Sequence, residues 1–142
     1  MASMTPEHMA AFLATPRLGM LSTLRRDGSP ITVPVWFEWD GAAVRIFTGR
    51  DDPKVRRLRR DPRASLLVAN NVGEPEAWVA FDGAVTIERA GVLELAERLA
   101  ARYWDMSDPA HERELASWRD AAAHLCVLVL APHRVRTRAA AS

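Results

Sequence analysis

The sequence predicts a mainly β protein with helical insertions (α+β), built as a small β-barrel. Three observations favour this class. Six or seven short segments are rich in β-branched and aromatic residues, turn signals separate many of them, and the helical segments are few and begin with capping residues. The 142 residues suit one domain, over residues 1–142, that buries roughly two thirds of its unfolded surface.

The first element is a helix over residues 5–14, because Thr5 supplies a hydroxyl N-cap and Pro6 suits the first helical position. Barrel strands then occupy residues 17–88. "RLGMLSTLR" and "PITVPVWFEW" flank the turn "RDGS", and "AVRIFT" follows the Asp40-Gly41 turn signal. We expect these strands to form an antiparallel meander.

A short helix interrupts the strands. Asp52 followed by Pro53 repeats the sequence of a cap and then proline, and Pro62 ends this helix near Asp61. "RASLLVA" and "EAWVAFDGAVTIE" are two further strands. A helical pair covers residues 91–123, and Asp108 before Pro109 again supplies a cap and a proline at the start of its second helix. Strands within 124–138 close the sheet, and the last residues, "RTRAAAS", are expected to fray.

Strand alternation assigns side chains to the two faces of the sheet. The expected core side of the second strand carries Ile31, Val33, Val35, Phe37 and Trp39. Trp36 therefore faces away from the barrel interior, and the same alternation places Trp78 outside in the strand over 76–88. A large aromatic side chain outside a core covers a ligand or a partner subunit, or is itself covered by a helix, and the pattern leaves these options open.

Positive charge is concentrated around the second helix. Residues 50–63 hold seven basic and three acidic side chains, although the whole chain carries only +1. Lys54 and Arg57 lie one turn apart, and with Arg50 they could hold a phosphate at the helix start. The other basic positions of this helix fit a solvated face: Arg56, Arg59 and Arg60. The chain has a pI near 8.0 and no nucleic-acid-binding motif, so a nucleic-acid partner is the least favoured interpretation.

Several classes of function are disfavoured. The single cysteine, Cys126, precludes an internal disulfide framework and indicates a reducing compartment. No apolar stretch approaches the length of a membrane span, and the first residues do not resemble a signal peptide, so we expect a cytoplasmic protein. No metal site is predicted, because the histidines are scattered and each is expected at the surface or at a strand end: His8, His111, His124 and His133.

Three segments together resemble the split β-barrel flavin and deazaflavin oxidoreductases, the superfamily that includes pyridoxamine 5'-phosphate oxidase. They are "STLRRDGSPITVPVWF", "TGRDDPKVRRLRRDPR" and "AWVAFDGAV". The resemblance implies a split β-barrel homodimer with two sites at the subunit interface for coenzyme F420, a deazaflavin, or for FMN. It places the ring system along Pro34, Val35 and Trp36, and Trp78 would approach from the partner chain. The phosphate would be held by Thr48, Gly49, Arg50 and Lys54, with Arg57 as a further candidate.

The chain departs from that family pattern at Asp52 and Pro53, where many relatives carry serine and arginine. An acidic cap at Asp52 would compete with a phosphate for the amides at the helix start. Val33 stands where the oxidase carries arginine, which argues against pyridoxamine phosphate oxidation itself.

The expected function is hydride transfer from reduced F420, or from FMN, to a small conjugated acceptor, and no side chain is identified as a general acid. Three alternatives use the same fold. They are a non-catalytic flavin or deazaflavin carrier, a haem-binding relative that uses one of the histidines, and a cofactor-free dimer whose site Asp52 has disabled.

Overall fold

The computed structural model describes residues 2–140, and their seven strands form one antiparallel sheet in the order β2-β1-β5-β6-β7-β4-β3. The strands are β1 (Gly19–Leu24), β2 (Pro30–Val35), β3 (Glu38–Trp39), β4 (Val44–Gly49), β5 (Arg63–Ala69), β6 (Ala77–Glu88) and β7 (Leu125–Ala139). The helices are α1 (Pro6–Ala14), α2 (Pro53–Arg60), α3 (Val92–Tyr103) and α4 (Pro109–Asp120), followed by a 3-10 turn, Ala122–His124. The predicted mainly β fold with helical insertions is confirmed.

The sheet closes on itself because of a very short connection. β2 and β3 lie at opposite ends of the strand order, yet only Trp36 and Phe37 separate them in the sequence. A chain advances at most about 3.5 Å per residue, so the two ends of the sheet must meet. The prediction of one continuous strand over residues 30–39 was wrong here, since the chain leaves its ladder with β1 after Val35 and joins β4 at Glu38.

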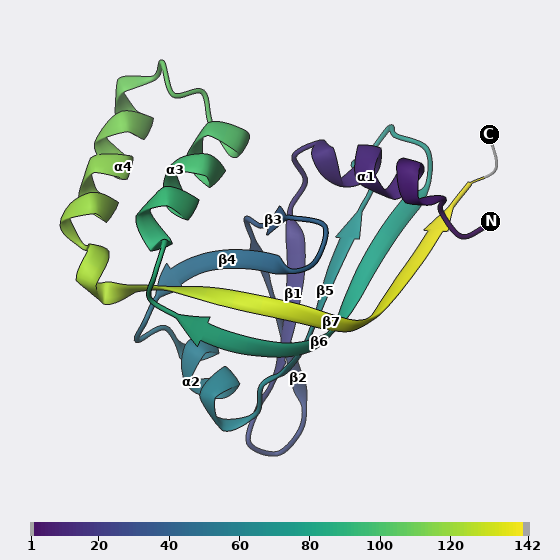
Figure 1. Ribbon diagram of the computed structural model, residues 1–142, viewed down its shortest axis with the longest axis horizontal. Coiled ribbons are helices and arrows are strands. Elements are labelled where there is room, and N and C mark those ends of the chain that lie inside the picture. Colours follow the sequence, from purple (N-terminus) through teal and green to yellow (C-terminus); the bar gives the residue numbers. More distant parts are fainter. Residues whose placement is uncertain (1, 141–142) are drawn as a thin grey trace.

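The helices cover different parts of this curled sheet (Figure 1). α3 and α4 lie side by side at one end, α1 lies across the other end, and α2 lies at the bottom of the view. Val55 and Leu58, the apolar side of α2, are buried in the barrel core. Asp52 and Asp108 accept hydrogen bonds at the starts of α2 and α4, which confirms the predicted caps.

The apolar run of β7 is buried on both faces. Cys126 and Leu128 pack into the barrel interior, whereas Val127 and Val129 pack under α3. Double burial explains why the sequence there does not alternate between apolar and polar residues. Cys126 is only 1% exposed, and this burial raises the pKa of its thiol, so it is the expected buried hydrophobe rather than a reactive thiolate.

The expected fraying of the C-terminal segment was wrong for the residues described. β7 is one continuous strand that runs to Ala139, paired with Ala77 of β6, and Ala2 forms a further bridge to Ala139. The Thr137 hydroxyl also accepts a hydrogen bond from the Met4 backbone at 2.9 Å. The two ends of the described chain therefore hold each other in place, and only residues 141–142 of the predicted tail lie outside the described residues.

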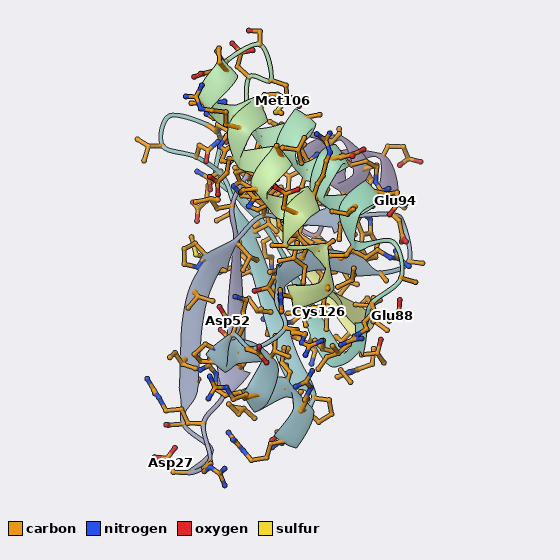
Figure 2. The ribbon with its side chains drawn as sticks, turned by 90° about the vertical axis from the view of Figure 1, so that its left-hand side faces the viewer. Asp27, Asp52, Glu88, Glu94, Met106 and Cys126 are labelled. Atoms are coloured by element: carbon orange, nitrogen blue, oxygen red, sulfur yellow. The ribbon has the colours of Figure 1, made fainter. Side chains whose placement is uncertain are left out.

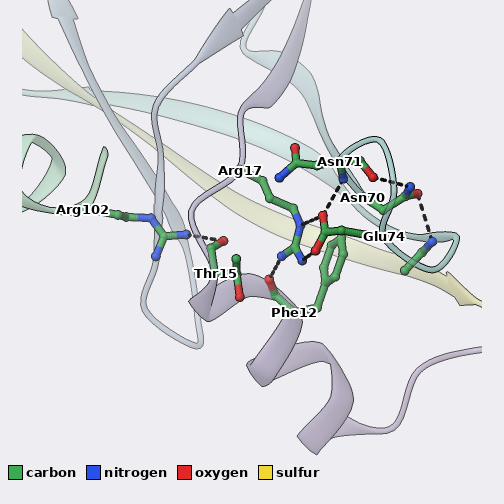
Figure 3. A network of polar contacts seen from close by, with 8 residues as sticks. Phe12, Thr15, Arg17, Asn70, Asn71, Glu74 and Arg102 are labelled. Carbon is green, nitrogen blue, oxygen red and sulfur yellow. Dashed lines mark hydrogen bonds and ion pairs between the residues drawn. The ribbon is translucent and has the colours of Figure 1, made fainter. Parts of the chain in front are cut away.

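Two arginines satisfy the carbonyl groups at the end of α1 (Figure 3). Arg17 is buried, donates to the Phe12 carbonyl and pairs with Glu74 at 2.6 Å. Arg102, from the end of α3, donates to the carbonyls of Leu13, Ala14 and Thr15. A helix leaves its last carbonyls without partners, so these contacts fix α1 against both the barrel and the helical pair.

A close backbone approach requires glycine at position 83. The register between β6 and β7 shifts between Asp82 and Gly83, and a Cβ atom on Gly83 would lie 2.2 Å from the Ala131 carbonyl oxygen. The contact is with backbone, so it cannot be relieved by turning a side chain. Glycine at a strand irregularity commonly marks such an approach.

Gly83→Ala should therefore lower the free energy of unfolding by about 1–3 kcal/mol, the usual cost of overpacking. Urea denaturation measures the change. Gly49→Ala is the matched control, because a Cβ atom on this β4 glycine would meet no atom within 4 Å. Equal destabilisation by both substitutions would show that contact with Ala131 is not the cause.

Candidate functional site

A hollow of about 530 Å³ lies between the barrel and the α3–α4 pair. Its barrel wall consists of Pro34, Val35, Trp36, Phe47 and Lys54. Its helical wall consists of Trp104, Ala110, His111, Glu114 and Trp118. The volume and the mainly apolar lining with a few charged groups are typical of small-molecule sites.

Aromatic side chains hold the two walls together. Trp36 stacks on Tyr103, with ring centroids 5.0 Å apart and planes 6° apart, and meets the edge of Trp104 at 4.7 Å. Trp118 stacks on Trp104 at 5.3 Å and contacts Phe47 at 5.0 Å. The helical pair therefore covers part of Trp36, while Trp36 also lines the hollow. Flat aromatic surfaces of this kind suit a planar conjugated ligand.

Lys54 carries the positive charge on the barrel wall, and Asp52 is its immediate partner. The Asp52 carboxylate accepts from the Lys54 backbone N–H at 3.0 Å and lies 3.2 Å from its ammonium nitrogen. Figure 2 shows Asp52 at the start of α2, below the helical pair. Burial works to raise the pKa of Asp52, but the hydrogen bonds from Lys54 and the nearby charge of Arg57 outweigh it and lower that pKa. The Asp52 carboxylate thus already binds one of the backbone amides at the start of α2, the groups for which we expect a phosphate to compete.

The other expected phosphate ligands do not line the hollow. Thr48 is buried in β4, and Gly49 ends that strand. The Arg50 side chain donates to the Ala123 carbonyl at 3.3 Å, and its backbone N–H donates to the His124 carbonyl at 2.8 Å.

Arg57 donates to the Thr23 hydroxyl at 2.8 Å. This contact joins α2 to β1, just as the contacts of Arg50 join the start of α2 to the turn before β7. Both arginines therefore make contacts that support the fold. Of the nine predicted site residues, the hollow brings together four: Pro34, Val35, Trp36 and Lys54.

Trp78 lies elsewhere on the monomer. It lines a second hollow of about 430 Å³ on the outer face of the sheet, formed entirely by residues of β1, β5, β6 and β7. The Arg136 guanidinium lies 5.9 Å from its ring centroid and is also bonded to Asp82. Leu67, another lining residue, is 40% exposed, and Met20 beside it is 38% exposed.

The sequence reasoning missed the helical wall. His111 was expected at the surface, but it is half-buried, its ring stacks on Trp104 at 4.5 Å, and it lines the hollow. Its spacing from Glu114 puts both residues on one face of α4, which the sequence could have indicated. The position of that face opposite β2 is set by tertiary packing, so no local pattern in the sequence could have predicted it.

Within residues 2–140, no group of three or more histidine, cysteine or acidic side chains could hold a metal ion. No helix in the same range has the length and apolar character needed to cross a membrane.

A family model and several solved structures each match nearly the whole chain. Residues 5–139 match the family model described as pyridoxamine 5'-phosphate oxidase. A solved structure described as an F420 reductase superposes with a TM-score of 0.73 at 25% identity, and the match covers 92% of this chain and 98% of that one.

Two more distant structures support the fold alone. One is a conserved hypothetical protein from Mycobacterium tuberculosis, with a TM-score of 0.75, 24% identity and coverage of 96% of this chain and 85% of that one. The other is a FAD-binding protein from Mesorhizobium loti, with a TM-score of 0.65, 19% identity and coverage of 99% and 98%.

The Asp52–Lys54 contact yields a test. Asp52→Asn keeps a good N-cap but removes the carboxylate charge, so it should strengthen binding of a phosphate-bearing probe such as FMN by up to about fivefold. Quenching of tryptophan fluorescence measures the affinity. Asp51→Asn, at the exposed neighbouring position, should change nothing. Unchanged affinity in Asp52→Asn, or the same gain in both variants, would show that Asp52 does not compete with the phosphate.

Proposed function

The chain belongs to the pyridoxamine 5'-phosphate oxidase family of split β-barrel proteins, and we propose that it is a cytoplasmic, flavin-type oxidoreductase. The proposed reaction is hydride transfer from reduced coenzyme F420, or less favourably FMN, to a small conjugated acceptor. One observation carries the proposal. A hollow with aromatic walls brings the predicted ring contacts at Pro34, Val35 and Trp36 together with the predicted phosphate ligand Lys54.

The residues of the hollow fit such a cofactor. Trp36 and Phe47 provide apolar surface on the barrel wall, and Trp104 and Trp118 provide it on the helical wall. Lys54 places one cation beside this apolar space, and its side chain is only 14% exposed. A planar ring system with an anionic tail matches this distribution of apolar surface and charge.

The charge beside Lys54 favours F420 over FMN. FMN ends in a phosphate monoester that carries about −1.5 to −2 at neutral pH, whereas the phosphate of F420 is a diester with a single negative charge. The Asp52 carboxylate, 3.2 Å from the lysine nitrogen, offsets the charge of Lys54, and the attraction lost is greater for the more highly charged monoester than for the diester. The likeness to a structure described as an F420 reductase agrees with this preference.

The protein would position the cofactor ring and keep water away from it, while the bound cofactor would supply the hydride chemistry. Trp36, fixed by its stacking on Tyr103, would set the plane of the ring. The apolar helical wall would exclude water from the space beside that ring. Lys54 would hold the anionic tail, leaving room for the acceptor on the helical side.

We further propose that the protein is a homodimer that uses the outer face of the sheet. Met20 and Leu67 are 38% and 40% exposed on this face, and Trp78 lines its hollow; Leu18, just before β1, is 46% exposed. Exposed apolar side chains clustered on one face are typical of protein interfaces. In such a dimer Trp78 would come close to the hollow of the partner, as the family resemblance implies.

Replacing the site lysine tests the proposed function. Lys54→Ala should weaken binding of F420, followed by tryptophan quenching, by about tenfold or more, because a charged contact to the phosphate is lost. Arg59→Ala, at an exposed position of the same helix, should bind as the unmodified protein does. Unchanged affinity in Lys54→Ala would refute the site. If Lys54→Ala does weaken binding, turnover of enones or quinones by the loaded unmodified protein distinguishes an enzyme from a carrier with the same site.

The dimer is tested separately. Leu67→Arg should convert it to a monomer, measured as mass by light scattering during gel filtration, because a charge would be buried in the interface. Val72→Arg, in an exposed loop, is the control and should leave the mass unchanged. A monomeric unmodified protein, or a Leu67→Arg variant that stays dimeric, would contradict the proposed interface.

A further inference from the structure

The helical wall of the hollow carries two titratable side chains that are not among the proposed cofactor contacts. His111 and Glu114 lie three residues apart on α4 and both line the hollow. Across from them are Trp36 and Lys54, which the proposed function assigns to the cofactor. If the cofactor ring lies against the barrel wall, its other face is turned toward α4. An acceptor on that face would therefore lie against α4.

The His111 ring is held in a defined orientation. Its Nδ1 atom lies 2.8 Å from the Asp105 backbone oxygen, and its plane stacks within 9° of that of Trp104. A carbonyl can only accept a hydrogen bond, so Nδ1 must carry the proton. Within residues 2–140, no side chain or backbone group is hydrogen-bonded to Nε2. Nε2 is therefore the nitrogen that can gain and lose a proton, which is the arrangement required of a proton donor.

We propose that His111 is the catalytic acid of this site and protonates the acceptor after hydride transfer. This inference rests on the proposed function. Hydride addition to the β-carbon of an enone forms a C–H bond, breaks the C=C π bond and leaves an enolate. The imidazolium Nε2–H bond then breaks, its proton goes to the enolate, and neutral His111 regains a proton from water. The reduced cofactor would supply both electrons with the hydride and would itself become oxidised.

The charges around His111 suit this role. Lys54 on α2 and Glu114 on α4 are the other ionisable residues that line the hollow, and the Asp105 carboxylate lies close enough to interact with the ring. The ring therefore faces charges of both signs, two carboxylates and one ammonium group. The enolate would form beside the imidazolium of His111, while Lys54 holds the anionic tail of the cofactor.

The first test needs no cofactor. Nitrogen-15 NMR of the apo-protein, assigned by the signals lost in His111→Gln, reports which ring nitrogen carries the proton in neutral His111. We expect Nδ1 protonated and Nε2 free, the opposite of the tautomer that dominates in free histidine. A neutral ring protonated at Nε2 would overturn the inference, even if the protein binds no cofactor at all.

The second test uses the loaded enzyme. His111→Gln should lower turnover by about 10²-fold with cofactor affinity unchanged, and should remove the fall in rate that the proposal predicts for the unmodified enzyme as pH rises. Added imidazole should partly restore turnover in His111→Ala. His8→Gln, on the exposed face of α1, is the matched control. Normal turnover with an unchanged pH profile in His111→Gln would overturn the role of His111 and leave the proposed function standing.

Discussion

The two-residue connection between β2 and β3 is the constraint on which the rest of the structure depends. Because Trp36 and Phe37 alone join the opposite ends of the strand order, the sheet has to close. Phe37 is fully buried inside the barrel, and Trp36 points outward against the helical pair. The Tyr103 hydroxyl donates to the Arg17 carbonyl at 2.7 Å and lies 3.4 Å from the Phe37 backbone nitrogen. The end of α3 therefore fixes the point of closure.

The candidate site is a consequence of that closure. The last residues of β2, the start of α2 and the face of α4 are distant in sequence, and they meet only where the barrel closes against the helical pair. Aromatic packing of Trp36 on Tyr103 and Trp104 sets the distance between the walls. The site is therefore built into the packing of the fold, so a change that loosens the helical pair alters the hollow as well.

Helix caps and strand alternation predicted much of this fold, because each depends on only a few neighbouring residues. The caps at Thr5, Asp52 and Asp108 lie where proline and capping side chains placed them, and alternation put Phe37 inside. The break in the strand over residues 30–39 was missed, since closure is a long-range effect that leaves the apolar alternation intact. His111 was missed for the same reason. Its partners, Trp104 and the wall of β2, are brought to it only by tertiary packing.

The most direct measurement of the central claim is a crystal structure of the protein with oxidised F420 bound. The account predicts the deazaflavin ring in the hollow between the end of β2 and the face of α4, with its phosphate near Lys54 and its free side toward His111. A ring bound on the outer face of the sheet beside Trp78, with this hollow empty, would contradict the account.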